Sequence, residues 1–193
     1  MPMDAPASIR AFVAVEINSE TREALTEIQA TLRNAGAHVA WVAPENLHVS
    51  LAFLGDTVTD LIPRLAHILD DVAALTPPFP FDVANLGAFG RPDSPRVIWA
   101  GVKKGEPLTV LQRRVADDLR GLGIALETPE FVPHLTLGRV RSSRGCRPLI
   151  DALRSTGEIV FGHVEASRVV LMRSVLASGG AQYSIVHGAQ FKG

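Results

Sequence analysis

The chain carries one short pattern twice: a histidine, an apolar residue, a hydroxyl residue and a second apolar residue. The copies are His48-Val49-Ser50-Leu51 and His134-Leu135-Thr136-Leu137. Successive side chains of a β-strand point to opposite faces, so each histidine shares a face with the hydroxyl two residues later, roughly 7 Å away. The apolar residues, and Phe53 after the first copy, are expected on the other face, toward the core. Each copy therefore predicts a strand with one face able to do chemistry.

Two imidazoles and two hydroxyls in one cleft suit acid–base chemistry. The ordinary pKa of histidine, near 6.5, lets His48 and His134 hold opposite protonation states around neutral pH and act as acid and base without a metal. The hydroxyls of Ser50 and Thr136 can donate hydrogen bonds to oxygen atoms on which negative charge develops. Either histidine alone is better explained as a structural residue in a polar pocket, so it is the matched pair that favours catalysis.

The elements around the two copies repeat in one order: strand, helix, histidine strand, helix, strand. Ile9 precedes His48 by 39 residues, and Val97 precedes His134 by 37. Hydrophobic periods of two and of three to four residues predict the elements. The predicted strands are 9–17, 39–42, 47–54, 79–86, 97–102, 133–140, 159–164, 167–176 and 181–191, the last two joined by a turn at Ser178-Gly179-Gly180, and the predicted helices are 19–35, 59–75, 108–122 and 148–155.

This repetition predicts a single α+β domain made by internal duplication. The duplicated parts are about 9–87 and 96–165, followed by a C-terminal hairpin over 167–191. Two pseudo-symmetric lobes are expected, each an antiparallel sheet with helices on its outer face. The two histidine strands should lie side by side in the central cleft between them. The segment 88–95 is expected to be the hinge between the lobes.

The residues around the two copies resemble those of a known family. Pro44-Glu45-Asn46-Leu47 precedes the first copy and Phe131-Val132-Pro133 precedes the second. With these flanks, the chain resembles the 2H phosphoesterase superfamily and, within it, the RNA 2′,3′-cyclic phosphodiesterases, also called 2′-5′ RNA ligases. The resemblance covers nearly the whole chain and includes Arg10-Ala11-Phe12-Val13-Ala14, Leu51-Ala52-Phe53-Leu54-Gly55, Arg96-Val97-Ile98-Trp99 and Arg139.

The resemblance implies an activity and a set of roles. The activity is hydrolysis of an RNA terminal 2′,3′-cyclic phosphate to a 2′-phosphomonoester without metal or cofactor, with 2′-5′ ligation as the reverse reaction. His134 would accept the proton of water and His48 would protonate the leaving ribose oxygen. Ser50, Thr136 and Arg139 would bind the phosphate. Ideal alternation puts Arg139 on the face away from His134, so a bulge near Gly138 would be needed to redirect it.

Two positions depart from the family. Ser50 stands where the family usually has threonine, which keeps the hydroxyl and loses the methyl group that stiffens χ1. Arg173 precedes Ser174 where the family commonly has an acidic residue, so no substrate contact is carried over to that position.

Three other functions remain open. The substrate could be a small cyclic nucleotide or a 2′-5′ oligonucleotide such as an oligoadenylate. The chain could be a non-catalytic module that binds RNA ends, although binding alone does not require both histidines. A histidine-ligated metallohydrolase is disfavoured because no carboxylate stands at ligand spacing.

Of the other histidines, His67 is expected to be exposed to solvent, and His163 and His187 are expected to be structural. His67 falls on the polar side of a predicted helix, and His163 and His187 lie in strands without a hydroxyl at the same spacing. Trp41, Phe89 and Trp99 could stack on a nucleobase, but packing in the core or in the cleft wall is favoured.

The composition restricts the ligands, the cellular compartment and the partners that are expected. The formal net charge is −1, so any anion must be held by a local cluster, for which arginine suits phosphate. A hydrophobic fraction of 47 % with 20 % charged residues indicates a soluble globule without a membrane span. The single Cys146 and the lack of a secretory signal at the start of the chain favour the cytoplasm. The expected partners are RNA ends or nucleotides with a 2′,3′-cyclic phosphate, and the expected state is a monomer.

Overall fold

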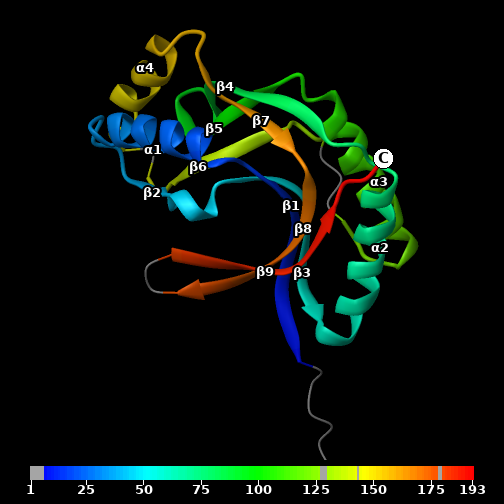
Figure 1. The fold of residues 1–193 in the computed structure, drawn as a ribbon. Helices are drawn as coiled ribbons and strands as arrows, with labels where there is room; N and C mark the ends of the chain where they lie inside the picture. Colours follow the sequence, from blue (N-terminus) through cyan, green and yellow to red (C-terminus); the bar gives the residue numbers. More distant parts are fainter. Residues whose placement is uncertain (1–6, 127–129, 143, 178–179) are drawn as a thin grey trace, which may run out of the picture.

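The computed structural model describes residues 7–126, 130–142, 144–177 and 180–193. Its strands form a curled antiparallel sheet with the helices on the outside (Figure 1). The elements in chain order are β1 (Ser8–Glu16), α1 (Ser19–Arg33), β2 (Val39–Trp41), η1 (Pro44–Asn46), β3 (His48–Val58), η2 (Thr59–Leu61), α2 (Ile62–Ala74), β4 (Phe79–Arg91), β5 (Ser94–Lys103), α3 (Glu106–Gly121), β6 (His134–Val140), α4 (Arg147–Ser155), β7 (Val160–Ala166), β8 (Arg168–Ala177) and β9 (Gly180–Gln190).

The sheet consists of two lobes that meet at the histidine strands. The strand order is β7-β4-β5-β6-β3-β1-β8-β9, with β2 paired to β6. At the centre, β3 and β6 are paired at Val49 and Leu135. We call β3, β1, β8 and β9 the terminal lobe, and β6, β5, β4, β7 and β2 the central lobe. The expected α+β architecture of two antiparallel lobes, with the histidine strands side by side, is confirmed.

Neither lobe is a contiguous half of the chain. β1 lies between β3 and β8, and β4 lies between β5 and β7. Helices α2 and α3 pack on the terminal lobe, and α1 and α4 on the central lobe, so they occupy opposite sides of the molecule (Figure 1). The expected hinge at 88–95 is wrong, because these residues close the β4–β5 hairpin, in which Phe89 pairs with Val97 and Arg91 with Ser94.

Helix α1 begins where its sequence predicts and ends at Arg33, two residues before the predicted end. The Asn18 side chain accepts a hydrogen bond from the Thr21 backbone N–H at 3.0 Å, which satisfies one of the free donors of the first turn. Leu25 and Leu32 are buried on its inner face. Gly36 follows the helix with a φ of +73°, a conformation that glycine adopts at no steric cost. The helix therefore docks one face on the central lobe.

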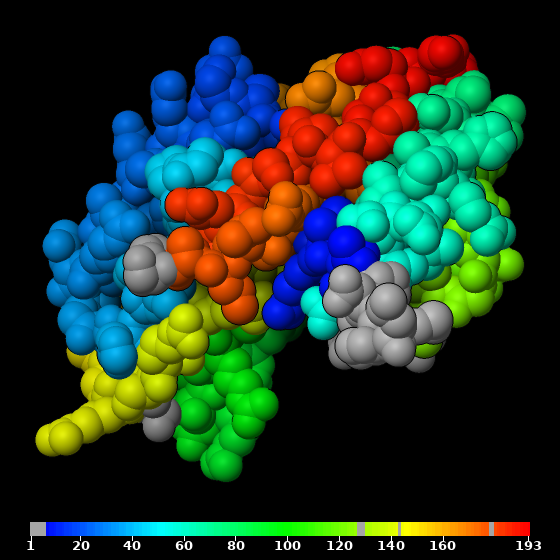
Figure 2. Space-filling view, turned by 90° about the horizontal axis from the view of Figure 1, so that it is seen from below, coloured from blue at the N-terminus to red at the C-terminus, as the bar shows by residue number. Residues whose placement is uncertain are grey.

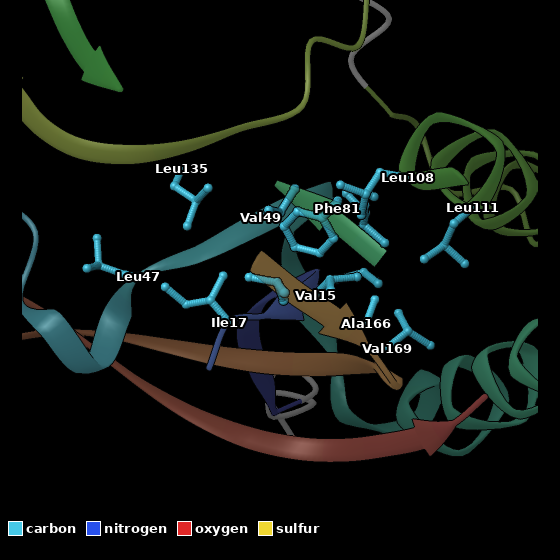
Figure 3. Packing of buried hydrophobic residues seen from close by; sticks show 14 of the residues in the cluster. Val15, Ile17, Leu47, Val49, Phe81, Leu108, Leu111, Leu135, Ala166 and Val169 are labelled. Atoms are coloured by element: carbon cyan, nitrogen blue, oxygen red, sulfur yellow. The ribbon is translucent and has the colours of Figure 1, made fainter. Parts of the chain in front are cut away.

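The hydrophobic core fills the space between the sheet and its helices. Figure 3 shows Val49 and Leu135, from the two histidine strands, among this core with Leu47 and Phe81. Val49 and Leu135 are fully buried, and burial of such side chains stabilises the fold by about 1.5–3 kcal/mol each. One face of each histidine strand is therefore packed in the core, and this packing stabilises the junction of the lobes.

A bulge interrupts each histidine strand at the same place. Ala14 lies opposite Ser50 and Val13 opposite Ala52, so Leu51 is an extra residue in β3. Such an extra residue shifts the alternation of the side chains that follow. Phe53, expected on the core face, is instead 64 % exposed and lies 6.0 Å from the Phe12 ring. That prediction is wrong because ideal alternation does not hold through the bulge.

In the second histidine strand, Trp99 lies opposite Thr136 and Ile98 opposite Gly138, so Leu137 is the extra residue. None of the helices within the described ranges is both long enough and apolar enough to cross a membrane. The predicted turn at Ser178-Gly179 lies outside the described residues, and the strands that flank it, β8 and β9, form the expected hairpin.

Candidate active site

The backbone fixes the orientation and tautomer of His48. Its Nδ1 lies 2.7 Å from the carbonyl oxygen of Asn46. A carbonyl can only accept, so Nδ1 carries the hydrogen and donates it. In the neutral ring Nε2 is then the acceptor, and the Ser50 hydroxyl, 2.9 Å away, donates to it. The nitrogen of His48 that does not bind the backbone is therefore Nε2, next to a hydroxyl.

His134 is held in the same way. Its Nδ1 lies 2.7 Å from the carbonyl oxygen of Val132, again two residues earlier in the chain. Nδ1–H donates to this carbonyl, which leaves Nε2 free for proton transfer. The repeated sequence pattern thus produces a repeated side-chain geometry.

The register of β3 and β6 brings the two copies together. The antiparallel pair at Val49 and Leu135 directs His48 toward Thr136 and Ser50 toward His134 on the neighbouring strand. After burial, which is the main cause, electrostatic repulsion by His134 also lowers the pKa of His48, so the two rings are near one another. Each imidazole therefore has one hydroxyl on its own strand and another on its neighbour.

Aromatic side chains enclose His48. The Phe12 ring stacks on it at a centroid distance of 4.9 Å, and Tyr183 of β9 meets it edge-on at 5.5 Å. The Asn46 amide donates to the Ala181 carbonyl at 2.6 Å, which ties the β8–β9 hairpin to the segment before His48. Figure 2 shows this orange and red hairpin beside the cyan residues around position 45. Burial lowers the pKa of His48 from 6.5 to about 4.

His134 has a more open setting. Phe89 meets its ring edge-on at 4.8 Å, and Trp99 lies 5.4 Å beyond Phe89. The Trp99 indole lies so close to Gly87 that a Cβ there would come within 2.3 Å of it. Burial, and secondly the positive charge of Arg139, lower the pKa of His134. Without an anion, both histidines are thus mostly neutral at pH 7, and the expected pKa near 6.5 is wrong for both.

The bulge at Leu137 returns Arg139 to the side of His134. It reverses the alternation after Thr136, so Arg139 lies on the face that ideal alternation denies it. The side chain is exposed, and its charge is near enough to affect His134. The structure therefore brings together the predicted site residues His48, Ser50, His134, Thr136 and Arg139, and their roles remain predictions.

His67, His163 and His187 lie outside this site, as predicted. Each is near a carboxylate of its own: His67 lies 3.6 Å from Asp71, His163 lies 2.6 Å from Asp82, and His187 lies 2.8 Å from Asp70.

Trp41 packs against the main core, and Phe89 and Trp99 form a wall beside His134. Arg173 pairs with Ala11, one residue out of phase with Phe12, and so faces away from His48. These positions agree with the sequence-based expectations.

Sequence reasoning missed the surroundings of the histidines. Phe12, Tyr183 and the carbonyls of Asn46 and Val132 all contact the imidazoles, as described above. Tyr183 lies on a strand from the opposite end of the chain, and no signal near either motif indicates it. The residues before each histidine do carry a signal, because the same two-residue step to a carbonyl occurs in both copies.

Within the residues that the structure describes, no three histidine, cysteine, aspartate or glutamate side chains form a group that could hold a metal ion. Of the charged side chains, Arg139 is near enough to affect His134, and Glu16, which pairs with His48 across β1 and β3, is near enough to affect His48.

Comparison with known proteins gives a consistent result. The family model described as LigT like Phosphoesterase matches residues 15–99 and 101–183. A protein of Methanothermobacter thermautotrophicus named RNA 2′,3′-cyclic phosphodiesterase is 34 % identical over 176 residues, which is 91 % of this chain and 95 % of that protein. A protein of the same name from Thermotoga maritima is 32 % identical, over 96 % of this chain and 97 % of its own.

Solved structures share the fold. The crystal structure of a Thermus thermophilus protein matches with a TM-score of 0.80 and 26 % identity, over 96 % of this chain and 99 % of that one. The crystal structure of Escherichia coli LigT in its apo form matches with a TM-score of 0.78 and 22 % identity, over 98 % of this chain and 100 % of that one.

Proposed function

The chain belongs to the LigT-like phosphoesterases of the 2H phosphoesterase superfamily, and on this basis we propose that it hydrolyses RNA terminal 2′,3′-cyclic phosphates. The product would be a 2′-phosphomonoester. The observation that carries this proposal is the pair of backbone-anchored imidazoles on adjacent strands, each with Nδ1–H bound to a carbonyl and Nε2 left for chemistry.

In the proposed reaction, water attacks phosphorus as the bond to the ribose 3′-oxygen breaks. Nε2 of His134 accepts a proton from the water, and Nε2–H of His48 gives a proton to the departing 3′-oxygen. One proton is taken and one is given, so the histidines end the cycle with their protonation states exchanged. Joining two ends through a 2′-5′ linkage would use the same groups in reverse.

Donors for the phosphate oxygens surround the imidazoles. The hydroxyls of Ser50 and Thr136 lie on the face of the histidines, and the planar guanidinium of Arg139 suits two phosphate oxygens at once. Donors placed where charge develops stabilise the transition state by several kcal/mol in general, on the order of 2.7–4 kcal/mol for one such group.

The acid role of His48 requires the anionic substrate. Its pKa of about 4 leaves the ring neutral at pH 7 in the empty site. A phosphate anion at van der Waals distance favours the charged imidazolium and raises this pKa. Substrate binding therefore favours the protonated form of His48, while the positive charge of Arg139 favours the neutral form of His134 that a base requires.

The test uses purified protein treated with EDTA and an oligonucleotide that ends in a 2′,3′-cyclic phosphate. We expect turnover in the presence of the chelator, and ³¹P NMR should place the product phosphate on the 2′-oxygen. Activity lost with EDTA and restored by Zn²⁺ or Mn²⁺ would contradict the two-histidine chemistry.

Parallel reactions address the other functions. Cyclic mononucleotides and 2′-5′ oligoadenylates serve as competing substrates, and a higher kcat/KM for either would redefine the substrate. Tight binding of the RNA end without turnover would indicate a binding module.

We further propose that the protein acts as a monomer in the cytoplasm. Both histidines come from one chain, and the single free Cys146 suits a reducing compartment. Light scattering on a size-exclusion column tests the oligomeric state, and a mass of twice 20.7 kDa would contradict it.

We also propose that residues 9–87 and 96–165 are duplicated parts of one bilobal domain, completed by the hairpin 167–191. The support is the matching arrangement of β1, α1 and β3 in the first part and β5, α3 and β6 in the second, where the first strand pairs antiparallel with the histidine strand in each. The two strands that pair with β4, which are β5 and β7, belong to the second part. We therefore expect that residues 1–95 alone do not fold, and circular dichroism can test this.

A further inference from the structure

A buried glutamine joins helix α1 to the second histidine strand. Gln29 is 0 % exposed, although its side chain is polar. Its amide nitrogen donates one hydrogen bond to the Leu137 carbonyl at 2.8 Å and another to the Val42 carbonyl at 2.9 Å. Both neighbours are acceptors, so the nitrogen of the amide must face them. The orientation of Gln29 is therefore fixed by its contacts.

These two carbonyls stand at places that matter for the site. Leu137 is the extra residue of the β6 bulge, and its carbonyl also accepts the Val42 N–H at 2.9 Å. The bulge is what turns Arg139 to the face of His134. Val42 follows β2 and precedes η1, whose last residue, Asn46, supplies the carbonyl that orients His48. Gln29 thus binds the backbone beside both catalytic segments.

The other lobe shows that a polar residue is not needed to dock the helix. Gln29 stands 19 residues before His48, and Val115 stands 19 residues before His134. Val115 is also 0 % exposed, and its helix α3 packs against β3, the strand with the matching bulge. In β3 the residue two positions after the bulge is Phe53. Its side chain is uncharged, so this bulge does not have to place a charge beside the phosphate.

A buried amide is a costly way to fill this space. Its oxygen, Oε1, has no hydrogen-bond partner among the described residues. A typical hydrogen bond adds only about 0.5–1.5 kcal/mol net, and an unpaired buried polar atom costs about 1–3 kcal/mol. Stability alone would therefore be served as well by an apolar side chain such as that of Val115.

We propose that Gln29 is a positioning residue for Arg139: its amide locks the Leu137 bulge and so holds the guanidinium beside His134, where the substrate phosphate would lie. The effect of Gln29 on catalysis rests on the proposed function. Its effect on the position of Arg139 rests only on the geometry of the bulge. Gln29 touches neither substrate nor imidazole and acts only through the backbone of β6.

The first test needs no substrate. Gln29→Met keeps the length of the side chain and removes the donor, and Val115→Ala is the matched control in the terminal lobe. NMR titration follows the His134 imidazole, which faces Arg139 on its own strand, His48 on β3, and the uncharged Phe89 and Gly101 on β4 and β5. Gln29→Met and Arg139→Ala should both raise the His134 pKa above that of wild type, because the positive charge moves away or is lost.

Val115→Ala should leave the His134 pKa unchanged while it lowers Tm. A wild-type His134 pKa in Gln29→Met would overturn the proposal. If Gln29→Met does not fold, Gln29→Asn keeps an amide but shortens its reach, and the same increase in pKa is expected.

The second test measures coupling on the cyclic-phosphate substrate. A catalytic group displaced by about 1 Å can cost on the order of 100-fold in rate, so Gln29→Met should lower kcat/KM by at least tenfold. In an Arg139→Ala background the same change should have little further effect, because both act through one guanidinium. Independent, multiplying losses would return Gln29 to a purely structural role.

The two tests separate the failures of the two proposals. If the wild-type protein does not turn over the substrate, the proposed function fails while the pKa result still decides the role of Gln29. If the wild type is active and Gln29→Met matches it in both tests, the positioning role alone fails.

Discussion

The two histidine strands start from one pattern and end in different surroundings. In both β3 and β6, the imidazole donates to a carbonyl two residues earlier, and a bulge follows the hydroxyl residue by one position. In β3 the histidine lies against Phe12 and Tyr183 and accepts from Ser50. In β6 it stands beside Phe89 and near Arg139.

The clearest difference is the fifth residue after each histidine. The two bulges turn this residue to the face of the site in both strands, where β3 carries Phe53 and β6 carries Arg139. An aromatic ring and a cation have opposite effects on a nearby anion, so equal backbones produce unequal sites. The strand fixes where the imidazole is, and the side chains around it determine its pKa and its task.

Removal of either imidazole is the strongest way to test whether the two strands are equally necessary. General acid or base catalysis typically contributes about 10²- to 10⁴-fold, so His48→Ala and His134→Ala should each lower kcat by that order. Because the two act in one step, the double variant should lose less than the product of the single losses. Steady-state kinetics on variants that circular dichroism finds folded would measure this, and near-normal turnover in either one would contradict it.

Alanine substitution of the fifth residue after each histidine tests whether Arg139 and Phe53 contribute differently to catalysis. Arg139→Ala should lower kcat/KM by about 10²- to 10³-fold, the range for loss of one transition-state donor, and Thr136→Ala should act in the same direction. Phe53→Ala is the matched control on the other strand and should leave the chemical step intact. Single-turnover rates would measure both, and equal losses at Phe53 and Arg139 would mean that the two strands do not differ as described.

The pH profile tests the difference in burial. His134 must be neutral and His48 protonated, and the pKa of each is below 6.5 in the free enzyme. The plot of kcat/KM, which reports the free enzyme, should be bell-shaped with its maximum below pH 6.5, because the pKa of each histidine is below 6.5. The plot of kcat should stay high to a higher pH, because bound phosphate raises the His48 pKa. A kcat/KM maximum above pH 7 would disagree with these shifts.

The smallest expected effect concerns the aromatic cover of His48. Tyr183→Ala should admit water and raise the His48 pKa from about 4 toward 6.5, since burial is the main cause of the decrease. NMR titration of His48 would report the change, and the His134 pKa in the same sample is the internal control. No change at His48 would show that Phe12 and the rest of the lobe suffice for its burial.

Most of the fold could be predicted because its signals are local. Hydrophobic periodicity, the Asn18 cap and Gly36 predicted a helix that forms as Ser19–Arg33. The four residues His48, Ser50, His134 and Thr136 share one site because a spacing of two residues keeps side chains on one face of a strand.

The rest depends on partners that the sequence does not reveal. Leu51 and Leu137 are apolar, as plain alternation requires, and only their pairing with β1 and β5 makes them bulges. The faces of Phe53 and Arg139 follow from that pairing. The low pKa of His48 follows from burial under a hairpin more than a hundred residues away, and the interleaving of the lobes follows from the place of β4 between β5 and β7.

The assignment of His48 as acid and His134 as base is tested most directly with a substrate whose leaving group needs no proton. In a 2′,3′-cyclic phosphate with sulfur in place of the bridging 3′-oxygen, the group leaves as a thiolate. On this substrate the turnover of His48→Ala should return close to that of wild type, while that of His134→Ala should remain low. Restoration of His134→Ala instead would reverse the two roles, and restoration of neither would contradict proton donation by either histidine.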